Sequence, residues 1–328
     1  MKYLKYIVIV VYVLAMPGTS FAQYKLYLTV AKDGSGDYTS IQNAVDATKS
    51  FPDKRITIFI MNGVYKEKVK VPAWNTNLSF IGESKENTII SWNDYFDKID
   101  RGRNSTFFTY TLKVEANDFH ATNLTIENTA GPVGQAVALH VTGDRCVFRN
   151  CHILGHQDAL YVAGQNSRQY FDSCFIEGTT DFIFGAATAL FDNCTINSLS
   201  NSYITAASTP EGKPFGYVFR NCNLTACSGV DSVYLGRPWR DYARVVFLDC
   251  KMGGHIVPRG WSNWSHTNRD KTAYYAEYNS TGPGANPEIR VDWSHQLTRE
   301  QAAKCTLNNI LSPVLPEEPQ PEEWIRCK

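Results

Sequence analysis

The chain has 328 residues, and its 32 basic and 32 acidic side chains give a formal net charge of +0. Because the net charge is zero and the sequence has no run of basic residues, overall charge does not bind this protein to nucleic acid or to an anionic membrane. If it binds a charged polymer, individual side chains at the binding site must hold that polymer. Roughly 300 residues of mature chain are enough for one large domain or two ordinary ones, and composition does not separate the two cases.

The N-terminal segment, residues 1–22, is predicted to be a secretory signal peptide. Two lysines precede an apolar stretch over residues 6–16, and residues 20–22 have the small-x-small pattern of a cleavage site. A membrane anchor would need about 20 apolar residues, whereas Pro17 ends this run. We therefore expect a secreted or periplasmic protein, free of the membrane in its mature form, with a single domain over residues 23–328.

Near the start of this domain, Ser40 precedes Ile41, Ala44 and Val45. A hydroxyl residue before apolar residues at helical spacing is typical of a capped amphipathic helix. Because the sequence that follows is repetitive, we expect this helix to close the open N-terminal end of a repeat structure.

The central part of the chain repeats one short phrase: Phe, any residue, a small polar residue, Cys, any residue and an aliphatic residue. The five copies are FRNCHI (148–153), FDSCFI (171–176), FDNCTI (191–196), FRNCNL (219–224) and FLDCKM (247–252). An earlier segment, ATNLTI (121–126), carries Leu124 where the cysteine would stand, and successive cysteine-like positions are 27, 23, 20, 28 and 28 residues apart. Repeats of roughly 20–30 residues indicate a solenoid.

Each repeat alternates with period two and is rich in Phe, Val, Ile and Tyr, which predicts strands rather than helices. The competing interpretation, a leucine-rich repeat, lacks its Leu-x-x-Leu-x-Leu framework here. We predict an all-β fold, a right-handed parallel β-helix with short capping helices at its ends and coils roughly 4.8 Å apart.

The five repeated cysteines are predicted to stack as free thiols inside the solenoid. Parallel side chains in register point the same way, which suits the disulfide dihedral poorly. Nine cysteines leave at least one thiol unpaired within a monomer. Cys227, Cys305 and Cys327 lie outside the phrase, and the sequence leaves open whether any of them pair.

The C-terminal part is predicted to hold one helix and a tail. Residues 297–311 are expected to form a second helix packed on the side or far end of the solenoid. The tail PVLPEEPQPEEW (313–324) contains four prolines, which predict an irregular strap without helix or central strand.

Asp158 follows Cys151 by seven residues, and Asp181 follows Cys174 by seven residues. The two aspartates are therefore 23 residues apart, the same interval as the two cysteines. If the cysteines stack, the two carboxyl groups lie about one strand spacing from each other. Repulsion and burial then favour one proton held between them, so that one can act as an acid while the other attacks. A surface turn is the alternative, but an apolar run follows each aspartate.

Two amides and one arginine are candidates for the same site. Gln157 adjoins Asp158, and Gln135 lies in the preceding coil. Their side-chain amides could donate hydrogen bonds to a developing oxyanion. Alternatively, they could form a stacked ladder that hydrogen-bonds to backbone groups of the turns. In YLGRPW (234–239), Arg237 offers a planar fork suited to a carboxylate and Trp239 a flat face suited to a sugar, although an ordinary surface turn is equally compatible.

These motifs together resemble the pectin methylesterases, carbohydrate esterases that remove methyl groups from esterified galacturonate. The matching segments, in the family's order, are GVYKEKV (63–69), QAVAL (135–139), GHQDAL (155–160), GTTDFIFG (178–185) and YLGRPW (234–239). Residues 30–45 and 257–264 also resemble the family. The resemblance implies a right-handed parallel β-helix that hydrolyses methyl esters of polygalacturonate, releases methanol and needs no metal or other cofactor.

The resemblance also assigns roles to residues. It implies Asp181 as nucleophile, Asp158 as general acid and then base, Gln135 and Gln157 as oxyanion donors, and Arg237 as the group that orients Asp181. The substrate contacts that we expect are Trp239, Tyr161, Phe182 and Trp261.

The chain departs from plant members of this family in three positions. It has His156, Ala159 and Thr180 where they usually carry Tyr, Thr and Val. The proposed chemical groups remain, while substrate contacts near His156 are expected to differ. Without the long inhibitor-like N-terminal region of many plant members, the chain looks like a catalytic domain secreted alone, more bacterial than plant in style.

Other interpretations of the sequence agree less well with its motifs. His152 and His156 would suggest zinc on a helix, but their segment is predicted as strand and turn, so no metal site is expected. A polygalacturonase or pectate lyase could use the same solenoid, yet the clustered aspartates or acidic calcium site are missing. A non-catalytic polysaccharide-binding β-helix would not need a desolvated carboxylate pair. We expect a monomer that binds methyl-esterified homogalacturonan and no nucleic acid.

Overall fold

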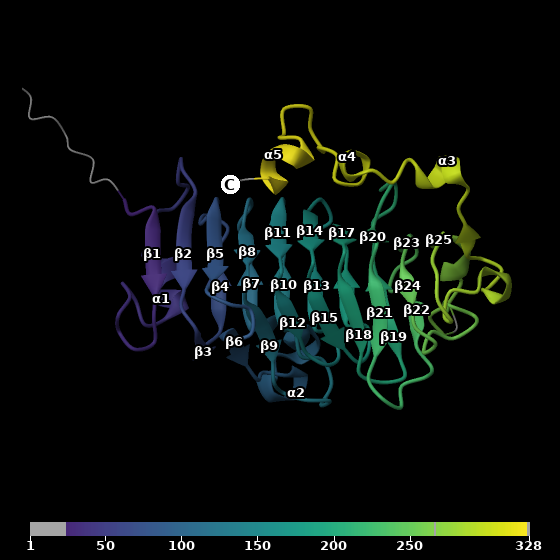
Figure 1. Cartoon of the computed structure of the whole chain (residues 1–328), viewed down its shortest axis with the longest axis horizontal. Coiled ribbons are helices and arrows are strands. Elements are labelled where there is room, and N and C mark those ends of the chain that lie inside the picture. The colour runs from purple at the N-terminus through teal and green to yellow at the C-terminus, as the bar shows by residue number, and fades with distance from the viewer. Residues whose placement is uncertain (1–23, 266, 327–328) are drawn as a thin grey trace, which may run out of the picture.

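The computed structural model describes residues 24–265 and 267–326, which form the predicted right-handed parallel β-helix (Figure 1). The predicted signal peptide, residues 1–22, and Cys327 lie outside the described residues. In each coil the chain visits three sheets in turn, and neighbouring strands within each sheet pair in parallel. The fold prediction is confirmed.

The three sheets hold the strands as follows. Sheet A contains β1 (Tyr27–Val30), β2 (Ile56–Ile60), β5 (Leu78–Gly82), β8 (His120–Thr122), β11 (Cys146–Arg149), β14 (Arg168–Asp172), β17 (Thr188–Asp192), β20 (Tyr217–Arg220), β23 (Arg244–Leu248), β25 (Tyr274–Tyr278) and β26 (His295–Gln296). Sheet B contains β3 (Gly63–Lys66), β6 (Thr88–Trp92), β9 (Thr125–Asn128), β12 (His152–Leu154), β15 (Phe175–Gly178), β18 (Thr195–Ser198), β21 (Asn223–Ala226) and β24 (Lys251–Met252). Sheet C contains β4 (Val69–Val71), β7 (Leu112–Val114), β10 (Leu139–Val141), β13 (Leu160–Val162), β16 (Ile183–Gly185), β19 (Tyr203–Ala207) and β22 (Tyr234–Gly236).

The helices are short and lie outside the three sheets. They are α1 (Ile41–Asp46), α2 (Phe96–Ile99), α3 (Arg299–Ala302), α4 (Leu307–Ile310) and α5 (Pro321–Ile325), together with the 3-10 turns η1 (Gly102–Phe108), η2 (Arg269–Lys271) and η3 (Pro287–Ile289). Within the part of the chain that the structure describes, no helix has the length and apolar character needed to span a bilayer.

Strand pairing in sheet B reproduces the register of the cysteine repeat. The aliphatic residue that closes each phrase pairs with its equivalent in the next coil, in the order Ile126, Ile153, Ile176, Ile196, Leu224 and Met252. The intervals of 27, 23, 20, 28 and 28 residues therefore each correspond to one complete coil.

The small polar residue of each phrase has a backbone role. It adopts a positive φ between 48° and 57° at Asn123, Asn150, Ser173, Asn193, Asn221 and Asp249. Asn and Asp tolerate the left-handed region better than other side chains because their short polar groups bond locally. Each repeated phrase thus contains the turn that leads from sheet A into sheet B and the start of the sheet B strand.

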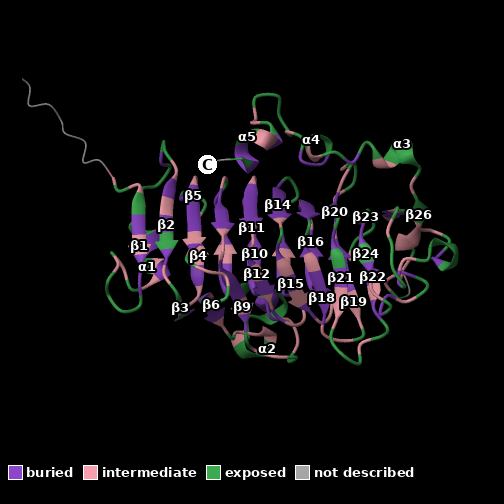
Figure 2. Ribbon diagram, in the orientation of Figure 1, coloured by how far each residue is buried: buried purple, intermediate pink, exposed green. Residues whose placement is uncertain are grey.

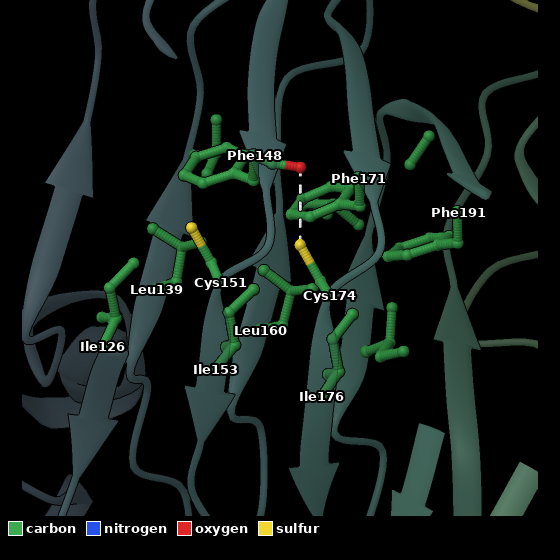
Figure 3. Packing of buried hydrophobic residues seen from close by; sticks show 14 of the residues in the cluster. Ile126, Leu139, Phe148, Cys151, Ile153, Leu160, Phe171, Cys174, Ile176 and Phe191 are labelled. Atoms are coloured by element: carbon green, nitrogen blue, oxygen red, sulfur yellow. Dashed lines mark hydrogen bonds between the residues drawn. The ribbon is translucent and has the colours of Figure 1, made fainter. Parts of the chain in front are cut away.

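The phenylalanines and cysteines of the phrase form two ladders in the core. Stacked rings run from Phe148 through Phe171 and Phe191, with centroids 5.0 and 4.8 Å apart, and the ladder continues to Phe247. Each thiol from Cys174 onward donates to the carbonyl of the phenylalanine one coil earlier, as Figure 3 shows for Cys174 and Phe148 (3.4 Å). The thiol therefore supplies a weak donor that alanine or valine would lack.

The five ladder cysteines are buried and free, as predicted. Cys146, Cys227 and Cys305 are free as well; Cys227 is exposed and the other two are buried. The N-terminal cap also matches its prediction, because Ser40 accepts a hydrogen bond from Asn43 and the apolar side of α1 is buried.

Two C-terminal predictions are wrong. Residues 297–311 hold two short helices, α3 and α4, because Thr306 starts a new helix with its own N-cap instead of continuing the first. The tail forms α5, since Pro321 stands at the first helical position, where its missing N–H is not needed. Trp324 and Ile325 of α5 are buried, and Figure 1 shows this segment running back along the solenoid.

The buried residues lie along the length of the solenoid. Figure 2 shows buried residues along the strands and exposed residues mainly in the loops and α3. The outward side of sheet C is an exception, since aromatic side chains gather there around Val137, Phe184 and Ala206. That face carries the candidate site.

The phenylalanine ladder should dominate local stability. Phe171→Ala is expected to lower the free energy of unfolding by about 3–5 kcal/mol, because it removes a ring stacked on both sides. Phe51→Ala, a control at an exposed ring, should change it by about 0.5 kcal/mol or less. Denaturant unfolding of the two variants measures the difference, and equal midpoints would contradict the ladder's role.

Candidate active site

A pocket of about 260 Å³ lies on the outer side of sheet C. Its lining includes the five residues for which the sequence suggested chemistry: Gln135, Gln157, Asp158, Asp181 and Arg237. These residues come from four separate regions of the chain, so the coil stacking brings them together.

The two aspartates occupy equivalent places in consecutive coils. Just after them, β13 and β16 pair Leu160 with Ile183, a shift of 23 residues that also relates Asp158 to Asp181. Both aspartates adopt a positive φ, 62° and 50°, a conformation that asparagine and aspartate accept and that recurs at functional sites. The predicted register is confirmed.

Arg237 binds only one member of the pair. Its Nε and Nη2 donate to the two carboxylate oxygens of Asp181 at 3.0 and 2.7 Å. Such a bidentate contact orients a carboxylate and favours its charged form. Asp181 itself is 6% exposed, so this pair is largely removed from water.

The pKa shifts of the two carboxyl groups differ. Burial raises the pKa of Asp158 well above its ordinary value, the charge of Asp181 raises it further, and Arg237 opposes both. Burial also raises the pKa of Asp181, but the hydrogen bonds and charge of Arg237 act against this rise. The electrostatics therefore favour a proton on Asp158 and a negative charge on Asp181.

Aromatic rings hold the guanidinium of Arg237 on both sides. Its central carbon lies 4.0 Å from the ring centroids of Tyr203 and of Trp264. Tyr234 stacks behind Tyr203 at 5.3 Å, so the sandwich is supported by the next coil. Cation–π contacts of this kind, partly shielded from water, restrict the plane in which Arg237 presents its donors.

The two glutamines face each other across adjacent coils. Gln135 and Gln157 form a parallel bridge, and Gln135 accepts a backbone hydrogen bond from Phe96 (2.9 Å). Neither side-chain amide bonds to another residue in the described ranges, although both line the pocket. This arrangement favours free N–H donors over the alternative, an amide ladder that satisfies turn backbone.

Two of the expected substrate contacts are wrong. Phe182 and Trp261 are both 0% exposed and belong to the main core. Phe182 follows Asp181 directly and packs inward, while the Trp261 indole donates to Glu277 inside the core (3.2 Å). Neither ring is accessible to a sugar.

The other two expected contacts lie on the outer face. Trp239 lines the pocket, and Tyr161 stacks on Phe184 with centroids 4.5 Å apart. Phe107 of η1 covers Tyr161 at 5.2 Å, so Tyr161 supports the pocket wall from behind.

Sequence reasoning missed half of the pocket lining. The further residues are Arg103, Thr106, Phe107, Phe184, Ala206 and Trp264. Trp264 ends the segment 257–264, which resembles the family, but the contact expected from that segment is Trp261. The three residues of η1 had no signal, because residues 93–111 carry no repeat.

A metal centre finds no support in the described ranges, since no group of three or more His, Cys, Asp or Glu side chains there could hold an ion. His152 lies in β12 and packs edge-on against Phe175. The available chemistry is that of two unequal carboxyl groups, two free amides and an aromatic wall.

Comparisons with known proteins agree with this chemistry. The family model described as Pectinesterase matches residues 27–313. "Pectinesterase 31" from Arabidopsis thaliana is 39% identical over 292 residues, which cover 87% of this chain and 92% of that protein.

Solved structures show the same fold. "Pectin methylesterase from Carrot" is 35% identical with a TM-score of 0.82, covering 87% of this chain and 92% of that chain. A pectin methylesterase "in complex with hexasaccharide VII" is 30% identical with a TM-score of 0.76, covering 89% of this chain and 98% of that chain. With a family model matched over most of its length and relatives at this identity, the chain belongs to the pectinesterase family.

Proposed function

We propose that this pectinesterase removes methyl groups from esterified pectin through a covalent intermediate on Asp181. The family and its structural relatives support pectin demethylesterification. The observation that carries the mechanism is the asymmetry of the pair: Arg237 binds Asp181 through two hydrogen bonds, whereas Asp158 retains a raised pKa.

In the first half-reaction, a carboxylate oxygen of Asp181 attacks the carbonyl carbon of the methyl ester. The negative charge that develops on the carbonyl oxygen is stabilised by amide N–H groups of Gln135 and Gln157, which are neutral donors. As the C–O bond to methoxide breaks, protonated Asp158 transfers its proton to that oxygen, and methanol leaves.

In the second half-reaction, Asp158 is ionised and acts as a base. It takes a proton from a water molecule, whose oxygen attacks the acyl carbon and displaces the carboxylate of Asp181. The product forms as a carboxylic acid that carries the second proton of the water and ionises into solvent as it leaves, while Asp158 again holds its proton. The carboxyl pair therefore returns to its starting charge at the end of each turnover.

The substrate and setting follow from the same site. The pocket opens on a face with several aromatic side chains, which suit sugar rings, and a related enzyme was solved with a hexasaccharide. We assign methyl-esterified homogalacturonan as the substrate and a monomer acting outside the cytoplasm as the working form. The leader pattern of residues 1–22 supports this location.

The nucleophile has a direct test. Asp181→Asn should lower methanol release from methylated pectin by about 10³-fold or more, because the amide cannot attack. Asp231→Asn, at an exposed aspartate, is the matched control and should retain wild-type release. Undiminished release by Asp181→Asn would refute the assignment, and shortened or unsaturated uronides would indicate a hydrolase or lyase instead.

The pH profile should report the unequal carboxyl groups. Methanol release requires Asp181 ionised and Asp158 protonated, so the rate should fall as the pH drops through the pKa of Asp181. It should fall again as the pH rises through the raised pKa of Asp158. In Asp158→Asn, a low residual rate without the alkaline limb is expected. An alkaline limb unchanged in that variant would assign it to another group.

The two rings that hold Arg237, Tyr203 and Trp264, should affect the acid limb of the pH profile of methanol release. Trp264→Ala frees one side of Arg237, which weakens its hold on Asp181, so the acid limb of kcat should move to higher pH. Trp264→Phe keeps a ring in place and should keep the limb close to that of the wild type. Loss of activity in Trp264→Ala with an unmoved acid limb would show that Trp264 serves only the sugar.

A further inference from the structure

Two arginines line the pocket, and only one of them has a partner. Arg237 is bound to Asp181 through both carboxylate oxygens. Arg103 is exposed, and among the residues that the structure describes no carboxylate, carbonyl or aromatic ring contacts its guanidinium.

Neighbouring arginines differ from Arg103 in this respect. Arg101 lies over the ring of Phe108 at 4.6 Å, and Arg240 lies over Trp239 at 4.6 Å and donates to its carbonyl oxygen. Arg269 donates to the carbonyl of Pro238 (3.1 Å). Among these five arginines around the pocket, Arg103 is therefore the one whose guanidinium is free.

The backbone that carries Arg103 is held in place on both sides. Ser105 is 0% exposed, and its hydroxyl accepts from the N–H of Arg101 (2.8 Å) and donates to the carbonyl of Gly102 (2.9 Å). Further along, the hydroxyl of Thr109 accepts from the N–H of Val137, two residues after Gln135 (2.9 Å). The base of Arg103 is thus tied to the coil that supplies an oxyanion donor.

The charge balance of the pocket leaves Arg103 uncompensated. Asp181 and Arg237 cancel each other, and Asp158 is neutral while it holds its proton. The remaining charge on the lining is the guanidinium of Arg103, which favours an anion with two oxygens in a plane. An esterified galacturonate unit offers no such group at C6, whereas a de-esterified unit does.

We propose that Arg103 binds the free carboxylate of a galacturonate unit that flanks the esterified unit in the pocket. This inference rests on the proposed function. It makes Arg103 a specificity-determining residue, which favours pectin that is already partly de-esterified. The carboxylate formed in one turnover then becomes a recognition group for the next, so that de-esterified units accumulate in contiguous runs.

The test compares two defined substrates: a fully methyl-esterified oligogalacturonide and one of the same length with part of its esters removed. Methanol release gives kcat/KM for each, and their ratio measures the preference. In Arg103→Gln the preference for the partly de-esterified substrate is expected to fall about 10-fold, in line with loss of one charge-assisted contact. Arg103→Lys, which keeps the charge without the planar fork, should retain part of it.

Arg101→Gln is the matched control, since Arg101 lies in the same segment and stacks on Phe108 instead of lining the pocket. It should keep the wild-type ratio. The wild-type preference should also shrink with added salt, because an exposed ion pair is screened.

Three outcomes would overturn the inference: no preference in the wild type, a ratio unchanged in Arg103→Gln, or an equal change in Arg101→Gln. Absence of methanol release from both substrates by the wild type would instead refute the proposed function, so the two failures are distinguishable.

Discussion

In-register pairing of parallel coils is the constraint on which both the core and the active site depend. Inside the solenoid it stacks phenylalanine rings and places the thiols of the ladder cysteines from Cys174 onward within hydrogen-bond distance of a carbonyl of the preceding coil. Outside, the same pairing sets Asp158 beside Asp181, a contact that two like charges would avoid in water. The core therefore stabilises the arrangement that the carboxyl pair alone would oppose.

The proposed mechanism requires that the two aspartates, which the repeat places in equivalent positions, behave differently. Two aspartates in matching turns would have similar properties, but Arg237 comes from beyond β22 and reaches only Asp181. Tyr203 and Trp264 hold it from opposite sides. One residue outside the pair thus gives two equivalent aspartates different pKa shifts, as the proposed division into an acid and a nucleophile requires.

Some of this was predictable from the sequence, and the reasons for success and failure are physical. The interval between cysteines gives the coil length directly, so the register of Asp158 with Asp181 followed from counting. The direction of Phe182 did not, because the left-handed backbone at Asp181 interrupts strand alternation. Choosing between Trp261 and Trp264 required knowing that Trp261 pairs with Gly236 of β22 and turns its ring into the core. The Pro-rich tail was judged by proline content, although Pro321 stands where a helix accepts it.

The connection between β6 and β7 forms one wall of the pocket without contributing a strand to any sheet. It contacts the solenoid through hydrogen bonds of Thr109 and Phe96 and through the packing of Phe107 on Tyr161, while its exposed residues can vary with the stacked coils intact. Chemistry and polymer recognition are thereby encoded in separable stretches of sequence. Proteins with this fold can therefore differ in the pectins that they bind while they keep the same residues for cleaving the ester.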